Sequence, residues 1–242
     1  MKLLLIRHGD PDYENDSLTE KGHIEAELLS RRIAPMDVKA YYTSPLGRAQ
    51  KTAEYTLNKA ERTAEVLDWA KEFFEVQIDD GNGGKRIAWD MLPQDWTNIP
   101  EYYDKDRWLE VKVMKDAGMR AGISKVHDGL DKLLERHGYK QEGNLYRAVS
   151  PNEDTVVLFC HFGVSCVMLS HLLGVSPMVL WHGVIAAPTS VTALVTEERR
   201  EGTASFRMTA FGDVSHLYKY NEPPAFAGRF CEMFSNEEQR HD

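Results

Sequence analysis

The sequence predicts an α/β protein, with three α/β/α layers, a mostly parallel central sheet and an inserted lid. Two observations carry this prediction. Three apolar segments, ending near residues 7, 43 and 160, are each followed by a polar motif and the start of a helix, and such alternation is typical of parallel sheets. From about residue 75 to 105 the composition instead becomes acidic and aromatic, which is not typical of a sheet.

The first third of the chain predicts strands that alternate with helices. The run from Lys2 to Ile6 is continuously apolar after its first residue and predicts a buried strand. Thr19 is suited to cap a helix, and Ser44-Pro45 to begin another, because proline favours the first helical turn. The predicted strands are 2–6, 38–43 and a short one near 65–67, and the predicted helices are 19–33 and 44–59.

The predicted lid spans about residues 75–140. Gly81-Asn82-Gly83-Gly84 has the composition of a hairpin tip, and tryptophans and tyrosines then alternate with acidic residues. Apolar side chains at helical spacing follow up to Gly138, and Gly118 and Gly122 predict a break or close packing within that helix.

The last third predicts the rest of the sheet. Residues 144–149 and 154–160 are expected to form a hairpin across Ser150-Pro151-Asn152-Glu153, and the second of these strands is apolar enough to be central. A helix over 164–173 and strands over 191–195 and 205–209 follow. The segment from about 213 to 242 predicts an irregular wrap, and residues 1–242 together predict a single domain.

Composition restricts the possible functions. The formal net charge of −9 argues against nucleic-acid binding and against an anionic membrane surface. No run approaches the roughly 18 apolar residues that a membrane span needs, and six residues before Arg7 leave no room for a signal peptide. Cys160, Cys166 and Cys231 have no metal-binding spacing, so we expect reduced thiols and a cytoplasmic protein.

The three strand ends carry side chains suited to binding phosphate. Arg7-His8-Gly9 follows the first strand, Arg48 lies in the first turn of the second helix, and His161-Phe162-Gly163 follows the apolar strand near residue 160. Because ligand sites collect at the carboxyl ends of parallel strands, these groups are expected to converge. Guanidinium groups and helix N-termini both favour phosphate oxygens. The pattern predicts a site for a tetrahedral dianion.

These motifs, in this order, resemble those of the histidine phosphatase superfamily, also called the phosphoglycerate mutase-like family. The resemblance covers positions 1–57 and 154–196, and Phe162 stands where the acid-phosphatase branch has aspartate. The matching stretches are Arg7-His8-Gly9, Leu18-Thr19 with Gly22 and Glu25-Ala26, Thr43-Ser44 with Arg48-Ala49 and Thr52-Ala53, and His161-Phe162-Gly163.

The resemblance implies a phosphomonoesterase that works in two steps through His8. His8 would attack phosphorus and become a phosphohistidine, which water then hydrolyses. Arg7, Arg48, His161 and Gly163 would hold the phosphate oxygens, and no metal or cofactor is expected. Glu72 is the best match for the general acid that protonates the leaving oxygen, with His161 also in the catalytic set. Glu75, Asp80 and Asp90 are its competitors.

Two alternatives stay open on the sequence. One is a phosphoglycerate-mutase-type isomerase, which Asp10-Pro11-Asp12-Tyr13-Glu14 disfavours, since mutases continue the first motif with Ser-Glu-Trp-Asn. The other is a catalytically silent phosphate-binding regulatory protein on the same fold. The expected partner is a small phosphomonoester whose leaving group is small or partly apolar, and the sequence leaves room for a homodimer.

Overall fold

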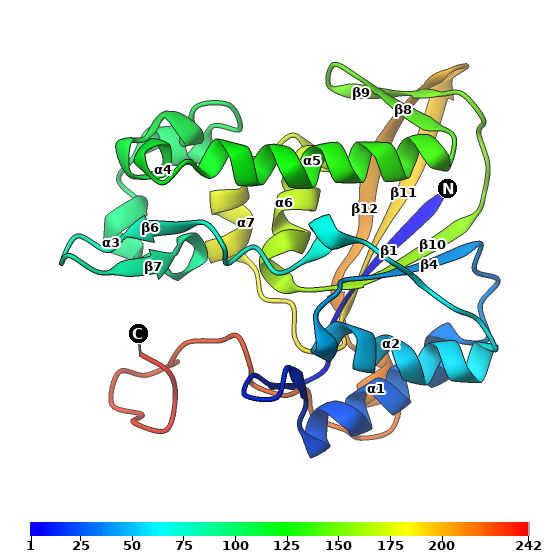
Figure 1. Ribbon diagram of the computed structural model, residues 1–242, viewed down its shortest axis with the longest axis horizontal. Helices are drawn as coiled ribbons and strands as arrows, with labels where there is room; N and C mark the ends of the chain where they lie inside the picture. The colour runs from blue at the N-terminus through cyan, green and yellow to red at the C-terminus, as the bar shows by residue number, and fades with distance from the viewer. Residues whose placement is uncertain (242) are drawn as a thin grey trace.

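The computed structural model describes residues 1–241, which form a mixed eight-stranded sheet with helices on both faces (Figure 1). The α/β class is confirmed. The strand order is β5-β4-β10-β1-β11-β12-β9-β8. The strands of this sheet are β1 (Lys2–Arg7), β4 (Ala40–Thr43), β5 (Glu65–Val66), β8 (Tyr139–Glu142), β9 (Leu145–Ala148), β10 (Thr155–Cys160), β11 (Val191–Arg200) and β12 (Thr203–Asp213).

The sheet is parallel in one half only, so the expectation of a mostly parallel sheet needs correction. β5, β4, β10 and β1 run parallel to one another. β11 and β12 form a long hairpin that is antiparallel to β1, and β9 and β8 continue it. The hairpin connection reverses the chain within a few residues, whereas each parallel step needs a crossover.

β1 is buried on both faces and divides the core into two parts. Leu3 and Leu5 pack into the cluster that also holds helices α5 (Met119–Arg136) and α6 (Phe162–Leu173). Leu4 and Ile6 pack into the opposite cluster, with α1 (Glu20–Ile33) and α2 (Gly47–Ala60). Alternation along the strand therefore produces the three layers seen in Figure 1.

The predicted helix starts were correct at α1 and three residues early at α2. Thr19 caps α1, because its side chain accepts a hydrogen bond from the Gly22 amide. α2 begins at Gly47 rather than at Ser44-Pro45, and the Gly47 amide donates to the carboxylate of Asp16, 2.6 Å away. A carboxylate from another part of the chain thus fixes where α2 begins.

The predicted hairpin between residues 144–149 and 154–160 is wrong. β9 pairs instead with the preceding strand β8, and Glu142 lies opposite Leu145. The two-residue turn needs a positive φ, which Gly143 supplies at 61°. β10 lies between β1 and β4. The polar residues of β8 do not have the composition of a strand, so the sequence pattern does not reveal this partner.

The segment between α2 and α5 lies beyond the carboxyl ends of the parallel strands (Figure 1). Gly118, at φ 68°, lies between α5 and the short helix before it, which agrees with the predicted break. The segment contains the hairpin β6 (Gln77–Asp79) and β7 (Lys85–Ile87), α3 (Pro93–Trp96) and α4 (Lys112–Asp116), with short 3-10 turns at Asp68–Ala70, Ala88–Asp90, Pro100–Tyr103 and Trp108–Glu110. The proposed division of residues 1–242 into one domain with a lid at 75–140 remains a prediction.

The remaining elements are short. Across residues 1–241, no helix combines the length and the apolar character that a membrane crossing requires. These elements are the ribbon β2 (Pro11–Asp12) with β3 (Ser17–Leu18), α7 (Pro177–Gly183) and α8 (Ser215–Tyr218). After α8 the described chain runs as an irregular segment toward the lid (Figure 1).

Candidate active site

Strand register brings the predicted histidines together. β1 and β10 are parallel with Arg7 opposite Cys160, so the residues that follow, His8 and His161, leave the sheet side by side. Their ring centroids are 5.1 Å apart. β4 ends beside β10, and Ser44 reaches His161 Nε2 through its hydroxyl at 2.7 Å. The predicted convergence at the carboxyl ends of these strands is present.

The His8 ring is held in one tautomer. Its Nδ1 lies 2.7 Å from the carbonyl oxygen of Gly9, which can only accept a hydrogen bond. Nδ1 therefore carries the proton and Nε2 has a free lone pair. Burial lowers the pKa of His8 well below its ordinary value, and the nearby Arg7 and Arg48 guanidinium groups lower it further. The imidazole is thus neutral and able to act as a nucleophile.

The two arginines of the site are held by different groups. Arg7 donates through Nη1 to the carbonyl oxygens of Ala186 and Ala227, at 2.6 and 3.2 Å. Arg48 donates to the carboxylate of Asp16 at 2.6 Å, which is the same carboxylate that caps α2. Asp16 therefore fixes both the helix and its arginine.

Three buried nitrogens of the site have no hydrogen-bond partner among residues 1–241: Arg7 Nε, Arg48 Nε and His161 Nδ1. Buried donors without a partner are costly, and an oxyanion with several acceptor oxygens would satisfy donors in such an arrangement. Burial, together with His8 and the arginines, lowers the pKa of His161 well below its ordinary value. His161 is therefore neutral, like His8.

Glu72 accepts backbone hydrogen bonds at the N-terminus of α6. Its Oε1 lies 2.8 Å from the Phe73 amide and 3.0 Å from the Val164 amide, and Oε2 lies 3.2 Å from the Gly163 amide. Burial raises the pKa of Glu72, although these amides and Arg7 act against the shift. A carboxyl group whose pKa is raised in this way can hold a proton for transfer.

The three competitors for the role of general acid, Glu75, Asp80 and Asp90, differ from Glu72 in position. Asp80 accepts the amides of Asn82 and Gly84 at the hairpin tip, and Glu75 is exposed. Asp90 does line the cavity described below, where it pairs with Arg240.

Gly163 has a different surrounding from the one predicted. The sequence analysis assigned it to phosphate binding, but its amide donates to Glu72. A Cβ atom on Gly163 would lie 2.7 Å from Glu72 Oε1 and 2.6 Å from the Trp89 ring. The missing side chain therefore makes room for the carboxyl group and the indole.

Gly163→Ala is expected to destabilise the protein by about 1–3 kcal/mol, because the overpacked Cβ displaces Glu72 or Trp89. Catalytic activity is expected to fall as well. Urea unfolding measures the first effect and steady-state kinetics the second. Gly183→Ala is the matched control, since a Cβ there meets no atom within 4 Å. Equal stability of both variants would contradict the expectation.

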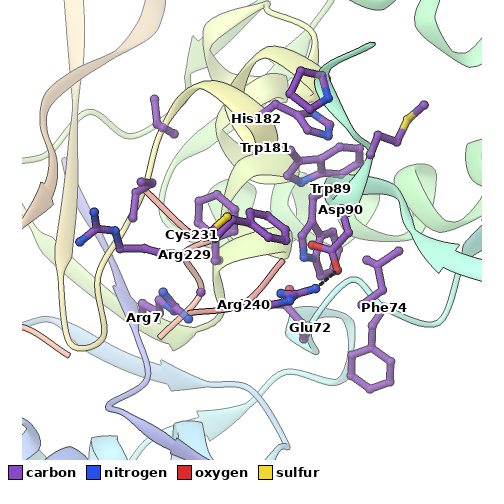
Figure 2. A pocket seen from close by; sticks show the side chains of 18 of the residues that line it. Arg7, Glu72, Phe74, Trp89, Asp90, Trp181, His182, Arg229, Cys231 and Arg240 are labelled. Carbon is purple, nitrogen blue, oxygen red and sulfur yellow. Dashed lines mark hydrogen bonds and ion pairs between the residues drawn. The ribbon is translucent and has the colours of Figure 1, made fainter. Parts of the chain in front are cut away.

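A cavity of about 740 Å³ opens from His8 and both arginines (Figure 2). Its walls come from three segments: residues 72–96, the stretch from Trp181 to Ile185, and residues 228–240 of the irregular segment after α8. Figure 2 shows Arg240 of this last segment meeting Asp90, which belongs to the first segment. Their ion pair measures 2.6 Å. The segment that the sequence predicted only as a wrap thus forms one wall.

Glu25 links the segment after α8 to the loop after β1. Its two carboxylate oxygens accept the amides of Asp10, at 3.1 Å, and Ala225, at 2.9 Å. Lys21 and Glu222 form an ion pair nearby. One fully buried carboxyl group therefore joins the loop after β1 to a stretch of chain 200 residues later.

The free energy of unfolding is expected to fall as pH rises between the pKa of Glu25 in the unfolded chain and its pKa in the folded protein. Burial raises the pKa of Glu25 to about 7, from about 4.3 in an unfolded chain. Between these values the folded chain binds more protons than the unfolded chain, so rising pH favours unfolding. Urea unfolding gives the free energy of unfolding of the wild type and of Glu25→Gln at each pH in this range. The difference between the two values isolates the contribution of Glu25. A difference that does not change with pH would contradict it.

The family model for branch 1 of the histidine phosphatase superfamily matches residues 3–208, which include His8, Arg48, Glu72 and His161. The chain belongs to this superfamily.

Relatives within the superfamily include phosphatases and mutases. The chain is 27% identical over 223 residues to phosphoserine phosphatase 1 of Hydrogenobacter thermophilus, which covers 86% of this chain and 93% of the relative. Solved structures agree on the fold. A phosphoserine phosphatase mutant from Entamoeba histolytica, in complex with phosphoserine, matches at TM-score 0.59 and 21% identity, over 89% of this chain and 98% of that one. Phosphoglycerate mutase from Bacillus anthracis matches at TM-score 0.60 and 17% identity, over 92% and 97%.

Several residues of this histidine phosphatase site were not predicted from the sequence. Asp16 lies in a loop with no recognisable motif. Thr52 lies within α2, and its hydroxyl accepts a hydrogen bond from the Gly9 amide, 2.9 Å away. Residues 227–232 belong to no regular element. Thr52 belongs to a stretch that matches the superfamily pattern but was not assigned to the site, although the periodicity of α2 turns it toward the same side as Arg48, four residues earlier. Within residues 1–241, no group of three or more His, Cys, Asp or Glu is arranged to hold a metal ion.

Proposed function

We propose that this histidine phosphatase superfamily member is a phosphomonoester hydrolase that forms a phosphohistidine at His8. The supporting observation is the hydrogen bond from His8 Nδ1 to the Gly9 carbonyl. It leaves Nε2 as the free nucleophilic nitrogen in a cavity that also contains Arg7 and Arg48.

In the first step, His8 Nε2 forms a bond to phosphorus and the bond from phosphorus to the leaving alcohol oxygen breaks. The protonated Glu72 carboxyl supplies a proton to that oxygen, and its raised pKa favours this role. Arg7, Arg48 and His161 hold the phosphoryl oxygens and offset their charge. Their unpartnered nitrogens support this assignment.

In the second step, water attacks phosphorus and the bond to His8 breaks. Glu72, now a carboxylate, accepts the proton from the water, and inorganic phosphate leaves. Gly163 acts in this proposal as a positioning residue, because its amide donates to Glu72 and its lack of a side chain makes room for that carboxyl group.

A mutase-type isomerase is the alternative that relatives named phosphoglycerate mutases support. The experiment that separates the two is incubation with 3-phosphoglycerate and with a panel of phosphomonoesters, while inorganic phosphate and 2-phosphoglycerate are measured together. Phosphate release without isomerisation is expected. Isomerisation faster than release would replace hydrolase by mutase, and neither reaction, with no phosphoenzyme, would favour a silent phosphate-binding protein.

A further inference from the structure

The part of the cavity beyond the phosphate-binding groups is aromatic. Trp89 and Trp181 lie with ring centroids 6.0 Å apart, and Trp96 stacks on His182 at 4.8 Å. Phe74, which is 38% exposed, lines the same cavity. At about 740 Å³ the cavity has room for a leaving group larger than a three-carbon chain. Its size and lining favour a planar, apolar group.

The positive charges beyond the phosphate-binding groups are already paired. Of the described lining residues, two arginines lie there: Arg229 forms an ion pair with Glu232, and Arg240 forms one with Asp90. Burial lowers the pKa of His182, although the Met178 carbonyl oxygen, 2.8 Å from its Nδ1, and the Asp90 carboxylate act against this shift. The cavity therefore combines aromatic walls with neutralised charges.

A carboxylate in this space would be disfavoured for two reasons. Contact with indole faces would remove its hydration without replacing the lost hydrogen bonds. Approach to either arginine would bring it against Glu232 or Asp90, and like charges in contact oppose binding.

We infer that the leaving group of the substrate is an uncharged, largely apolar alcohol with a planar ring, and that carboxylate-bearing phosphomonoesters are excluded. This inference rests on the proposed function, in that it places a phosphate at His8, Arg7 and Arg48. It goes further by stating which substrate class fits the rest of the cavity.

The test uses one matched pair of ligands that differ by a single carboxylate. Benzylphosphonate and 4-carboxybenzylphosphonate cannot be hydrolysed, so calorimetric binding to the full chain reports on the cavity whether or not the protein is an enzyme. We expect benzylphosphonate to bind at least about tenfold more tightly. Equal binding, tighter binding of the carboxylate, or binding of neither would overturn the inference.

Hydrolysis of benzyl phosphate and 4-carboxybenzyl phosphate separates the two proposals. Discrimination in binding with no turnover of either ester would defeat the proposed hydrolase and leave the inference standing. Turnover of both esters with equal kcat/KM would defeat the inference and leave the hydrolase standing.

Asp90→Asn tests the charge argument with little change in shape. It removes the carboxylate that faces Arg240, so the preference for benzylphosphonate is expected to shrink by about tenfold. Asp95→Asn is the matched control, because Asp95 belongs to the same lid and pairs with Arg86 but does not line the cavity. A preference unchanged in Asp90→Asn, or changed equally in both variants, would contradict the role of paired charges.

Discussion

Replacing His8 with alanine is expected to lower the rate of phosphate release by at least about 10⁴-fold, as for other enzymes that lose their nucleophile. No other imidazole takes its place, because His161 Nε2 is engaged by Ser44 and its ring centroid lies 5.1 Å away. The measurement is steady-state kinetics together with quenching in alkaline detergent after addition of labelled substrate. A phosphoenzyme that is stable to base and labile to acid should appear in the wild type and be absent from His8→Ala.

His23→Ala is the matched control for that experiment. His23 is a half-buried histidine of α1 whose partner is the Tyr55 hydroxyl, 3.0 Å away, and it does not line the cavity. Its loss is expected to leave phosphoenzyme formation intact. A labelled phosphoenzyme in His8→Ala, with thermal unfolding unchanged, would show that another group is the nucleophile.

Replacing Glu72 with glutamine is expected to slow hydrolysis in a manner that depends on the leaving group. An alkyl alcohol needs a proton as it leaves, so benzyl phosphate should lose about 10²–10⁴-fold in kcat/KM. 4-Nitrophenolate leaves without one, so 4-nitrophenyl phosphate should lose less than about tenfold. The comparison of the two substrates is the measurement, because a purely structural defect would slow both equally.

Stability must be followed in the same variant. The Glu72 carboxyl accepts three backbone amides, and a glutamine amide group facing any of them leaves a donor unpaired, at a cost of about 1–3 kcal/mol. Urea unfolding measures that cost. Asp90→Asn is the matched control for the acid, since Asp90 lines the same cavity. If Asp90→Asn shows the leaving-group dependence and Glu72→Gln does not, Asp90 is the acid.

The residues of the site that could be predicted are those that stand at the end of a strand or the start of a helix, because the direction of the chain then fixes the edge of the sheet at which they lie. His8, Arg48 and His161 each follow or begin an element whose type is evident from its apolar pattern, and parallel strands end at the same edge. Glu72 lies outside any regular element. Its resemblance to the superfamily pattern indicated it, whereas its contact with the Gly163 amide could be seen only in three dimensions.

The parts that could not be predicted depend on contacts between distant segments. Asp16 caps a helix that begins 31 residues later, and Glu25 holds an amide 200 residues later. Neither contact leaves a periodic pattern in the sequence. The mixed sheet was missed for a related reason, because the apolar patterns of β11 and β12 identify strands but do not give the direction in which each strand pairs with its neighbour.

The carbonyl of Ala227 lies 220 residues beyond the Arg7 guanidinium that donates to it. At about 5–20 residues per second, a ribosome that has made β1 needs roughly 10–45 seconds to add that partner. For most of this interval the nascent chain already contains His8 and both arginines, but the wall formed by residues 228–240 does not yet exist. The cavity beside His8 is therefore completed only after Ala227 and the residues that follow it have been added, and an unfinished chain that ends before Ala227 lacks one wall of that cavity.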